Sequence, residues 1–323
     1  MKKIVVIGLG NVGFTYVNVS VARGIEAEWV FIDKNKDLCD AHAHDFQDMV
    51  AVLPRNGSTF RAGTFADAKG ADIAVVCASI PAGKDMSDRL ALAGKNAELM
   101  KSFTEELKNA GFKGVFIVAA NPCDVMAAAI HYAGNYPFKK VISAGTTLDS
   151  ARMKKFIAQR FNIAADSVNV SVLGEHGGSA FVAWSQAKIG DINFKNILKT
   201  KRIKKDELDE LEVKMKKEGF YIWERKGNTQ FGIATSLYEI TQAVLLNKRT
   251  VMNIGVKLPS SYKHSGVWIS IPVIVGENGY EYLPTKPTLS DDEWAKFEKS
   301  SALLAKVHNE TLNQIGIHTD IEE

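Results

Sequence analysis

Three side chains near the middle of the sequence have the types and the spacing for proton transfer next to a small anion. His176 stands in the segment Gly174-Glu175-His176-Gly177, and an imidazole that titrates near neutral pH can accept a proton and return it. Asp149 and Arg152 are three residues apart, so on a helix they face the same side. The planar guanidinium of Arg152 suits two parallel hydrogen bonds to a carboxylate. The alternative interpretations are a buried structural histidine at 176 and a helix N-cap at Asp149.

A second group of residues suits the binding of phosphates. The segment Gly8-Leu9-Gly10-Asn11-Val12-Gly13 follows a short apolar run and opens a helical stretch, and Asp33 ends the next apolar run. In such a segment Gly8 permits a tight turn, Gly10 lets a pyrophosphate approach the main chain, and Gly13 lets the helix pack closely on the strand. A carboxylate at Asp33 would accept hydrogen bonds from ribose hydroxyls and repel a 2′-phosphate. The pattern predicts NAD rather than NADP; the alternative is a glycine-rich turn with an unrelated aspartate.

The elements that must position these groups alternate along the first half of the chain. Five short apolar runs rich in valine and isoleucine are each followed by a turn and then by a stretch of helical length. Strands that are buried on both faces have this composition, which predicts an α/β Rossmann fold, a doubly wound parallel sheet covered by helices. The expected strands are Ile4–Ile7, Trp29–Ile32, Ile73–Ala78, Val115–Ala120 and Val141–Ala144.

Polar segments follow three of the expected strands. Asn121-Pro122-Cys123-Asp124 comes after the fourth run, Thr147–Arg152 comes after the fifth, and Gly174–Gly177 comes after Val168–Leu173. In open α/β sheets, ligands bind outside the carboxyl ends of the strands. The first two segments are therefore expected at the ligand-binding edge of the sheet, and the third at the end of a strand of the second half.

The second half of the chain has an α+β pattern. Its expected strands are Val168–Leu173, Phe181–Trp184 and Val267–Val275, and Asn278-Gly279 predicts a hairpin turn after the last of them. Its expected helices are Lys204–Glu218, Thr229–Leu246 and one that a capping box at Ser290 opens and that continues to about Leu312. We predict a nucleotide-binding domain over residues 1–145 and a domain for substrate and subunit contacts over residues 146–323.

Composition narrows the class of protein further. The 323 residues include 40 basic and 37 acidic side chains, and a net charge of +3 gives no reason to expect a nucleic-acid partner. The three cysteines form no CxxC pair, so a disulfide framework or a metal site is not expected. A cytoplasmic location is expected for the same reason. No segment reaches about 18 consecutive apolar residues, so no membrane span is expected.

Seven motifs occur in the order known from the L-lactate/L-malate dehydrogenase family, and the resemblance covers nearly the whole chain. The motifs are GLGNVG, FIDKN, SDRL, AANPCD, TTLDSAR, LGEHGGS and PVIVG. Within the family, the segments GEHGGSAFVAWS, DFQD and GFKGV are most similar to the L-2-hydroxyisocaproate dehydrogenases of lactic acid bacteria. The resemblance implies reversible, NAD-dependent hydride transfer between nicotinamide and C2 of a small 2-hydroxy or 2-oxo acid.

The same resemblance implies a role for each candidate residue. His176 matches the histidine that exchanges the hydroxyl proton, and Asp149 matches the carboxylate that fixes its tautomer and stabilises the imidazolium. Arg152 matches the arginine that binds the substrate carboxylate. Arg89 matches an arginine that polarises the substrate carbonyl, unless it is an incidental arginine of a surface loop. Asn121 is expected to hold the substrate oxygen or the nicotinamide ribose.

The residues expected around the substrate side chain differ from those of most family members. Thr229 aligns with a threonine that lines the pocket, and Ser79–Asp88 is expected to form a lid. The specificity position falls near Ala82 or Gly83, where malate enzymes have arginine and lactate enzymes have glutamine. Small residues there favour a branched or bulky apolar side chain such as that of 2-oxoisocaproate. Lys84 keeps a dicarboxylate substrate open, and a lactate or malate dehydrogenase is the alternative.

Two other classes and the assembly state complete the expectations. An NAD-dependent glycosidase would need a metal site built from cysteine and histidine in the cleft, and a non-catalytic NAD sensor could lose His176 or Arg89. Both of those residues are present.

The apolar helices expected at Phe14–Ala22 and Thr229–Leu246 resemble subunit-contact elements of the family. They imply a homo-oligomer, with a tetramer favoured over a dimer.

Overall fold

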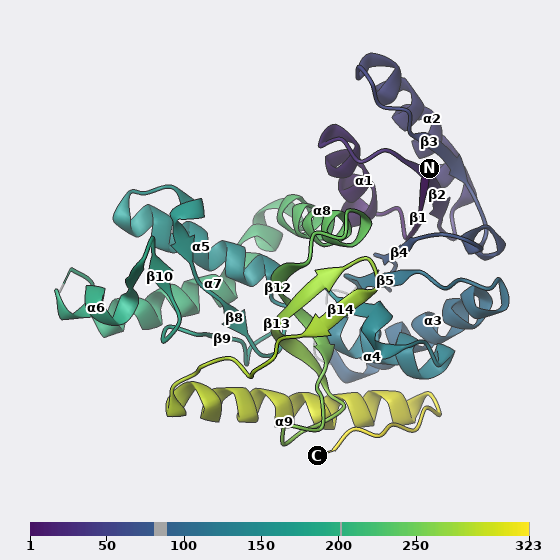
Figure 1. Cartoon of the computed structure of the whole chain (residues 1–323). Coiled ribbons are helices and arrows are strands. Elements are labelled where there is room, and N and C mark those ends of the chain that lie inside the picture. Colours follow the sequence, from purple (N-terminus) through teal and green to yellow (C-terminus); the bar gives the residue numbers. More distant parts are fainter. Residues whose placement is uncertain (81–88, 201, 323) are drawn as a thin grey trace.

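The first half of the chain forms a parallel sheet (Figure 1). The computed structural model describes residues 1–80, 89–200 and 202–322, and for residues 89–91 only the main chain is described. Within these residues the parallel strands are β1 (Lys2–Ile7), β2 (Ala27–Ile32), β3 (Thr59–Ala62), β4 (Ile73–Val76), β5 (Val115–Val118) and β6 (Val141–Ser143). Their order is β3-β2-β1-β4-β5-β6, and each neighbouring pair is parallel. This is the doubly wound Rossmann order, so the predicted fold class is confirmed.

Five of these strands match those predicted from the sequence, and β3 was not predicted. Strand β3 is four residues long, contains Arg61, and lies at one edge of the sheet beside β2. Such a short strand with a polar side chain carries little hydrophobic signal. The predicted strand at 73–78 ends at Val76 and the one at 115–120 ends at Val118, so the chain leaves the sheet two residues earlier than expected.

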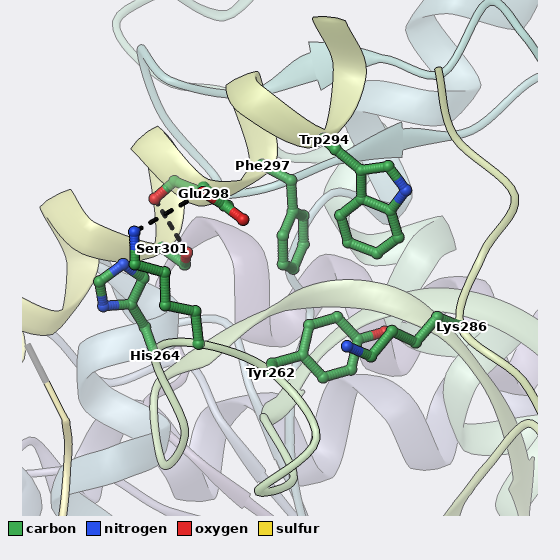
Figure 2. A pocket seen from close by; sticks show the side chains of 8 residues that line it. Tyr262, His264, Lys286, Trp294, Phe297, Glu298 and Ser301 are labelled. Atoms are coloured by element: carbon green, nitrogen blue, oxygen red, sulfur yellow. Dashed lines mark hydrogen bonds and ion pairs between the residues drawn. The ribbon is translucent and has the colours of Figure 1, made fainter. Parts of the chain in front are cut away.

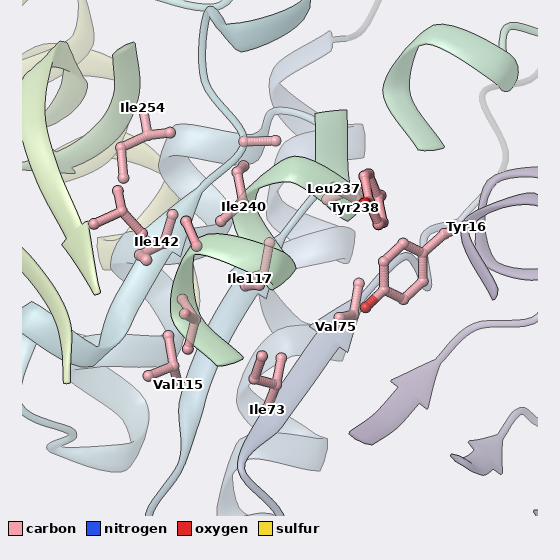
Figure 3. Packing of buried hydrophobic residues seen from close by; sticks show 14 of the residues in the cluster. Tyr16, Ile73, Val75, Val115, Ile117, Ile142, Leu237, Tyr238, Ile240 and Ile254 are labelled. Carbon is pink, nitrogen blue, oxygen red and sulfur yellow. The ribbon is translucent and has the colours of Figure 1, made fainter. Parts of the chain in front are cut away.

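The central strands are buried on both faces because helices cover each side of the sheet. Figure 3 shows Ile73 and Val75 of β4 and Ile117 of β5 on the side where Ile240 of α8 (Phe231–Leu245) packs. The intervening residues of these strands belong to a second core, which α3 (Arg89–Asn109) and α4 (Cys123–Gly134) cover. Two buried faces explain why the sequence of these strands is continuously apolar rather than alternating.

Strands of the second half extend the same sheet. Strands β12 (Thr250–Lys257), β13 (Trp268–Gly276) and β14 (Gly279–Tyr282) are antiparallel, and β12 pairs with β6 where Gly255 lies opposite Ser143. The predicted β13–β14 hairpin is present, but its loop residues are Glu277 and Asn278, one position before the expected Asn278-Gly279. Strand β12 was not predicted, because its outer half is exposed and glycine interrupts its apolar pattern.

The remaining part of the second half differs from its expected elements in two places. The expected strand Val168–Leu173 is two short strands, β7 (Val168–Asn169) and β8 (Val172–Leu173), which pair with different partners: β7 with β10 (Lys188–Ile189) and β8 with β9 (Phe181–Val182). Strand β11 (Ile192–Asn193) completes the sheet of β7 and β10. Helix α8 begins at Phe231 rather than at Thr229.

Helices cover both faces of the large sheet. Helix α1 (Asn11–Ala22) packs on α8 on one face, and α3, α4 and the long helix α9 (Asp291–Gln314) contact one another on the other. The predicted capping box opens α9, with Ser290 Oγ accepting from the Glu293 amide. The other helices are α2 (Lys36–Val52), α5 (Thr147–Phe161), α6 (Phe194–Lys199) and α7 (Lys205–Lys226). In the part of the chain that is described, the helices are too short or too polar to cross a membrane.

Candidate active site

The glycine loop between β1 and α1 has the geometry that its sequence predicted. Gly8 has a φ of +96°, and a β-carbon there would lie 2.4 Å from the Ala78 nitrogen. A β-carbon at Gly13 would lie 2.0 Å from the Gly8 oxygen, so only glycine lets α1 start this close to β1. At Gly10 a β-carbon would meet no protein atom within 4 Å. The loop therefore leaves open space next to Gly10 and the first amides of α1, which is where a pyrophosphate would bind.

Asp33 lies against the glycine loop. Its Oδ2 accepts a hydrogen bond from the Leu9 amide at 2.8 Å, and its Oδ1 accepts one from the Asn35 amide at 3.1 Å. The carboxylate is partly buried at the end of β2, beside the start of α1. This is the position from which a carboxylate can reach the ribose hydroxyls of a dinucleotide whose phosphates lie on the loop. The residues present therefore fit NAD.

Asp149 contacts both His176 and Arg152. Asp149 Oδ2 is 2.6 Å from His176 Nδ1, and Asp149 Oδ1 accepts from Arg152 Nη1 at 3.1 Å. Helix α5 supplies the aspartate and the arginine one turn apart, and the loop after β8 supplies the histidine. The N-cap of α5 is Thr146, so Asp149 does not cap the helix and both of its oxygens serve the site. The alternative reading of Asp149 as an N-cap is wrong.

The electrostatics of this group suit reversible proton transfer. Burial acts to lower the pKa of His176, but the charge and hydrogen bond of Asp149, together with the charge of Asp124, raise that pKa above its ordinary value. Burial acts to raise the pKa of Asp149, yet the neighbouring His176 and Arg152 hold it below its ordinary value. Asp149 thus stays ionised and stabilises an imidazolium. Because Asp149 holds Nδ1, proton exchange with a substrate falls to Nε2.

Asp124 is a buried carboxylate that contacts the loop of His176. Its sequence position, in the polar segment 121–124, predicted no role for it. Its side chain is only 2 % exposed, its Oδ1 accepts from Ser143 Oγ at 2.7 Å, and its Oδ2 accepts from the His176 amide at 3.1 Å. Burial raises the pKa of Asp124 to about 6, against the opposing effect of these hydrogen bonds. The carboxylate ties the start of α4 and the end of β6 to the loop that carries His176.

Asn96 is a second residue that sequence reasoning missed. It lies on α3 with 2 % exposure, accepts from the Ile80 amide at 2.7 Å, and donates to the Asn121 oxygen at 3.2 Å. The side chain of Asn121 is exposed at the carboxyl end of β5. Asn96 therefore fixes the main chain at Asn121 relative to α3. A buried asparagine inside a helical sequence is the signal that could have identified it, because buried amides need partners.

Several predicted site residues are only partly described. Gly83, with Ala82 and Lys84, lies outside the described residues, and so does most of the expected lid. Arg89 begins α3, but its side chain also lies outside the described part. Thr229 is partly buried in the connection between α7 and α8. Its contact with the substrate, like those of Arg89 and Gly83, stays a prediction.

Two cavities lie away from these groups. One, of about 330 Å³, lies between α9 and residues 262–264 (Figure 2), and the other, of about 1110 Å³, lies along α5, α8 and β12. None of the predicted site residues lines either cavity. Burial raises the pKa of all three cysteine thiols, so they are protonated at neutral pH and poor nucleophiles. Over the described ranges, no three metal-binding side chains gather in one place.

The chain matches known dehydrogenases over nearly its whole length. Residues 2–143 match the NAD binding domain of lactate/malate dehydrogenase, and residues 146–315 match the alpha/beta C-terminal domain of that family. The L-lactate dehydrogenase of Mycoplasmoides gallisepticum is 38 % identical over 98 % of this chain and 99 % of its own. L-lactate dehydrogenase 2 of Staphylococcus aureus is 35 % identical over 94 % of both chains.

Solved structures show the same similarity. The minor L-lactate dehydrogenase of Enterococcus mundtii superposes with a TM-score of 0.90 at 29 % identity, over 95 % of this chain and 98 % of its own. Malate dehydrogenase of Plasmodium falciparum superposes with a TM-score of 0.91 at 23 % identity, over 98 % of this chain and 100 % of its own, a likeness of fold alone.

The matches to this family over both halves of the chain show an NAD-dependent oxidoreductase that acts on a CH–OH group. The chain belongs to the lactate/malate dehydrogenase family. The glycosidase and NAD-sensor alternatives are thereby set aside, because the relatives are dehydrogenases over their whole length.

Proposed function

We propose that the enzyme reduces 2-oxo acids with a branched or bulky apolar side chain, such as 2-oxoisocaproate, in preference to pyruvate and oxaloacetate. The observation that carries the proposal is Gly219, which lies inside the 22-residue helix α7 and beside Arg152. A β-carbon at Gly219 would lie 3.2 Å from Arg152 Nη2, closer than most such contacts. Glycine inside a helix costs about 1 kcal/mol relative to alanine, and at Gly219 the guanidinium lies where a side chain would pack, so the glycine keeps α7 from crowding the proposed carboxylate site.

The described residues account for binding and proton transfer in this reaction. Arg152 would bind the substrate carboxylate through its fork, and Asp149 holds both the guanidinium and the imidazole in place. His176 gives a proton from Nε2 to the oxygen at C2 during reduction and takes it back during oxidation. The bound cofactor would donate hydride as NADH during reduction and accept hydride as NAD during oxidation. The glycine loop and Asp33 would hold this cofactor. Arg89, Asn121 and Thr229 are proposed to complete the contacts with the substrate.

The expected selectivity follows from apolar burial. With the carboxylate on Arg152 and the oxygen on His176, the side chain of the substrate points to the remaining space, which we assign to the region of Gly219. Ala82 and Gly83, the small residues that the sequence predicts at the specificity position, lie outside the described residues. Each buried methylene contributes about 0.8 kcal/mol, so a four-carbon side chain gains roughly 2 kcal/mol over a methyl group. A preference of about 10–200-fold is the usual range for discrimination of this kind.

The test compares kcat/KM for 2-oxoisocaproate, phenylpyruvate, pyruvate and oxaloacetate at saturating NADH. We expect 2-oxoisocaproate to lead pyruvate by at least about tenfold. Gly219→Ala should lower kcat/KM for the bulky acids more than for pyruvate, so that the ratio between them is the readout. Lys217→Ala, on an exposed position of the same helix, is the matched control. If pyruvate or oxaloacetate leads by about tenfold, the lactate or malate alternative holds instead.

We further propose a homo-oligomer, with a tetramer favoured over a dimer. The apolar face of α1 does not support this as the sequence suggested, because α8 of the same chain covers it. Support comes from the groove of about 1110 Å³ along α5, α8 and β12, where Phe231 is 63 % exposed and Val251 is 53 % exposed. Exposed apolar side chains gathered at a groove are typical of subunit contacts. Sedimentation as a monomer at micromolar concentration would contradict the proposal.

A cytoplasmic location belongs to the same proposal. Cys39, Cys77 and Cys123 are free thiols, two of them buried, which fits a reducing compartment. Recovery of the enzyme from a secreted or membrane fraction of its cells, rather than with the soluble cytoplasmic proteins, would contradict this assignment.

A further inference from the structure

The loop that carries His176 is held through three successive main-chain amides, each by a different element. The Gly174 amide donates to the Ser270 oxygen of β13 at 3.2 Å. The Glu175 amide donates to Ser300 Oγ of α9 at 2.9 Å. The His176 amide donates to Asp124 Oδ2 of α4 at 3.1 Å. The position of the imidazole therefore depends on α9, a helix that carries none of the predicted site residues.

The contact with α9 is part of a closed ring of hydrogen bonds. Ser179 Oγ contacts Glu175 Oε2 at one end and Ser300 Oγ, at 2.8 Å, at the other. A carboxylate only accepts, so the Ser179 hydroxyl donates to Glu175 and accepts from Ser300. Ser300 in turn accepts from the Glu175 amide. The ring thus starts at the amide of Glu175 and ends at its carboxylate, and hydrogen bonds joined in this way strengthen one another.

The glycines of the loop leave room for this ring. Gly174 has a φ of +94°, and a β-carbon there would lie 2.9 Å from Ser300 Oγ. A β-carbon at Gly177 would lie 2.5 Å from Glu175 Oε1. Both glycines therefore fit the ring as well as the turn. Ser300 itself is fully buried, so its hydroxyl depends on protein partners for its hydrogen bonds.

We propose that Ser300 is a positioning residue for catalysis, which acts through the main chain of Glu175 to fix His176 against Asp149. The distance from His176 Nδ1 to Asp149 Oδ2 is 2.6 Å, short enough that a small rotation of the loop would weaken it. Without the α9 hydroxyl, the Glu175 amide loses its acceptor and Ser179 loses its donor. The loop then keeps only its bonds to β13 and α4, and the imidazole loses its fixed orientation.

The next residue along α9 provides a matched control. Ser301 is also buried, at 2 % exposure, and its Oγ donates to the Glu298 oxygen within the same helix at 3.0 Å. Figure 2 shows Ser301 and Glu298 at the cavity beside Tyr262 and Phe297, a site that the predicted catalytic residues do not line. Ser301→Ala removes the same group from the same helix without touching the loop of His176.

The test compares Ser300→Ala with Ser301→Ala in the full-length enzyme, with pyruvate or another 2-oxo acid that it reduces. We expect kcat of Ser300→Ala to fall by about tenfold to 100-fold, with KM for NADH within about twofold, because the reacting geometry changes while the cofactor loop does not. The pH at which reduction declines should also fall, since a looser Asp149 raises the pKa of His176 less. Ser301→Ala should leave kcat and the pH profile unchanged.

A structural role alone would give a different result. If both variants lose equal thermal stability and Ser300→Ala keeps the pH profile and kcat of Ser301→Ala, the proposal is overturned. Ser300→Cys replaces the hydroxyl with a thiol, a much weaker acceptor for the Glu175 amide, so it decides the question if Ser300→Ala does not fold. Unchanged kcat and pH profile in Ser300→Cys would overturn the proposal, and a matching loss and pH shift would support it. The outcome does not depend on which 2-oxo acid is preferred.

Discussion

Asp149→Asn is expected to lower kcat/KM for reduction of the best 2-oxo acid by about 10²–10⁴-fold, the range of a general acid–base contribution. An amide carries no charge to stabilise the imidazolium, and its NH₂ group offers a donor to His176 Nδ1 where a carboxylate accepts. The same change removes the acceptor of Arg152 Nη1. The measurement is steady-state kinetics by NADH absorbance. NADH binding, followed by fluorescence, should stay within about twofold, since the glycine loop and Asp33 are untouched.

The sign of the pH effect follows from the pKa of His176. Reduction needs the protonated imidazole, so its rate is full below this pKa and declines as the pH rises through it. Burial acts to lower the pKa, and Asp149 with Asp124 raises it above the ordinary value. In Asp149→Asn the main raising contribution is lost, so the decline should begin at lower pH. Alcohol oxidation needs the neutral imidazole and should be less impaired at high pH.

A control variant separates this effect from loss of any carboxylate. Asp166→Asn changes an exposed aspartate beyond the C-terminal end of α5 and should leave both kcat/KM and the pH profile unchanged. If Asp149→Asn retained more than about a tenth of the activity with an unchanged pH profile, His176 would not depend on Asp149 for proton transfer.

Arg152→Lys is expected to raise KM for the 2-oxo acid and to lower kcat/KM by about 10²-fold or more. The guanidinium can form two parallel hydrogen bonds to a carboxylate, whereas an ammonium is a point charge without that fork. Each charge-assisted hydrogen bond contributes about 1.5–3 kcal/mol, so the loss of one accounts for about tenfold to 100-fold, and misorientation of the substrate adds to it. The side chain is only 12 % exposed, so water cannot readily replace the missing donor.

Arg160→Lys is the matched control for this prediction. Arg160 lies on the same helix, α5, but is 39 % exposed and pairs with Glu207 at the surface. Its replacement keeps the positive charge and removes a planar guanidinium to which no substrate carboxylate is proposed to bind. kcat/KM should therefore change by less than about twofold, as expected for an exposed ion pair. Equal effects of the two substitutions would show that Arg152 does not bind the substrate carboxylate.

The parts of the fold that the sequence predicts are those where one physical requirement dominates. The central strands are buried on both faces, so their sequence is continuously apolar, and with the crossover rule this predicts a doubly wound parallel sheet. The glycine loop can likewise be predicted from the sequence, because Gly8 and Gly13 have neighbours that leave no room for a side chain. Asp149, Arg152 and His176 could be paired because local spacing and a family pattern agreed.

The remaining features depend on contacts between distant parts of the chain. Strand β12 is strand-like only because β6 and β13 lie beside it, and its own sequence is half polar. The segment 168–173 has the apolar pattern of one strand, but partners on two different sheets divide it. Asn96, Asp124 and Ser300 act on site residues between 25 and 125 positions away in the sequence. Spacing along the chain does not show such contacts.

Because β12 pairs with β6, the two halves of the enzyme cannot be exchanged between relatives as independent modules. Gly255 of β12 lies opposite Ser143, and a β-carbon there would lie 2.3 Å from Asp124 Oδ1, the carboxylate that holds the His176 amide. A chimera that exchanged only the first 145 residues with a relative would therefore join an aspartate from one parent to the strand of another. Compatibility at residue 255, far from the joint in the chain, would decide whether such a hybrid kept its catalytic geometry.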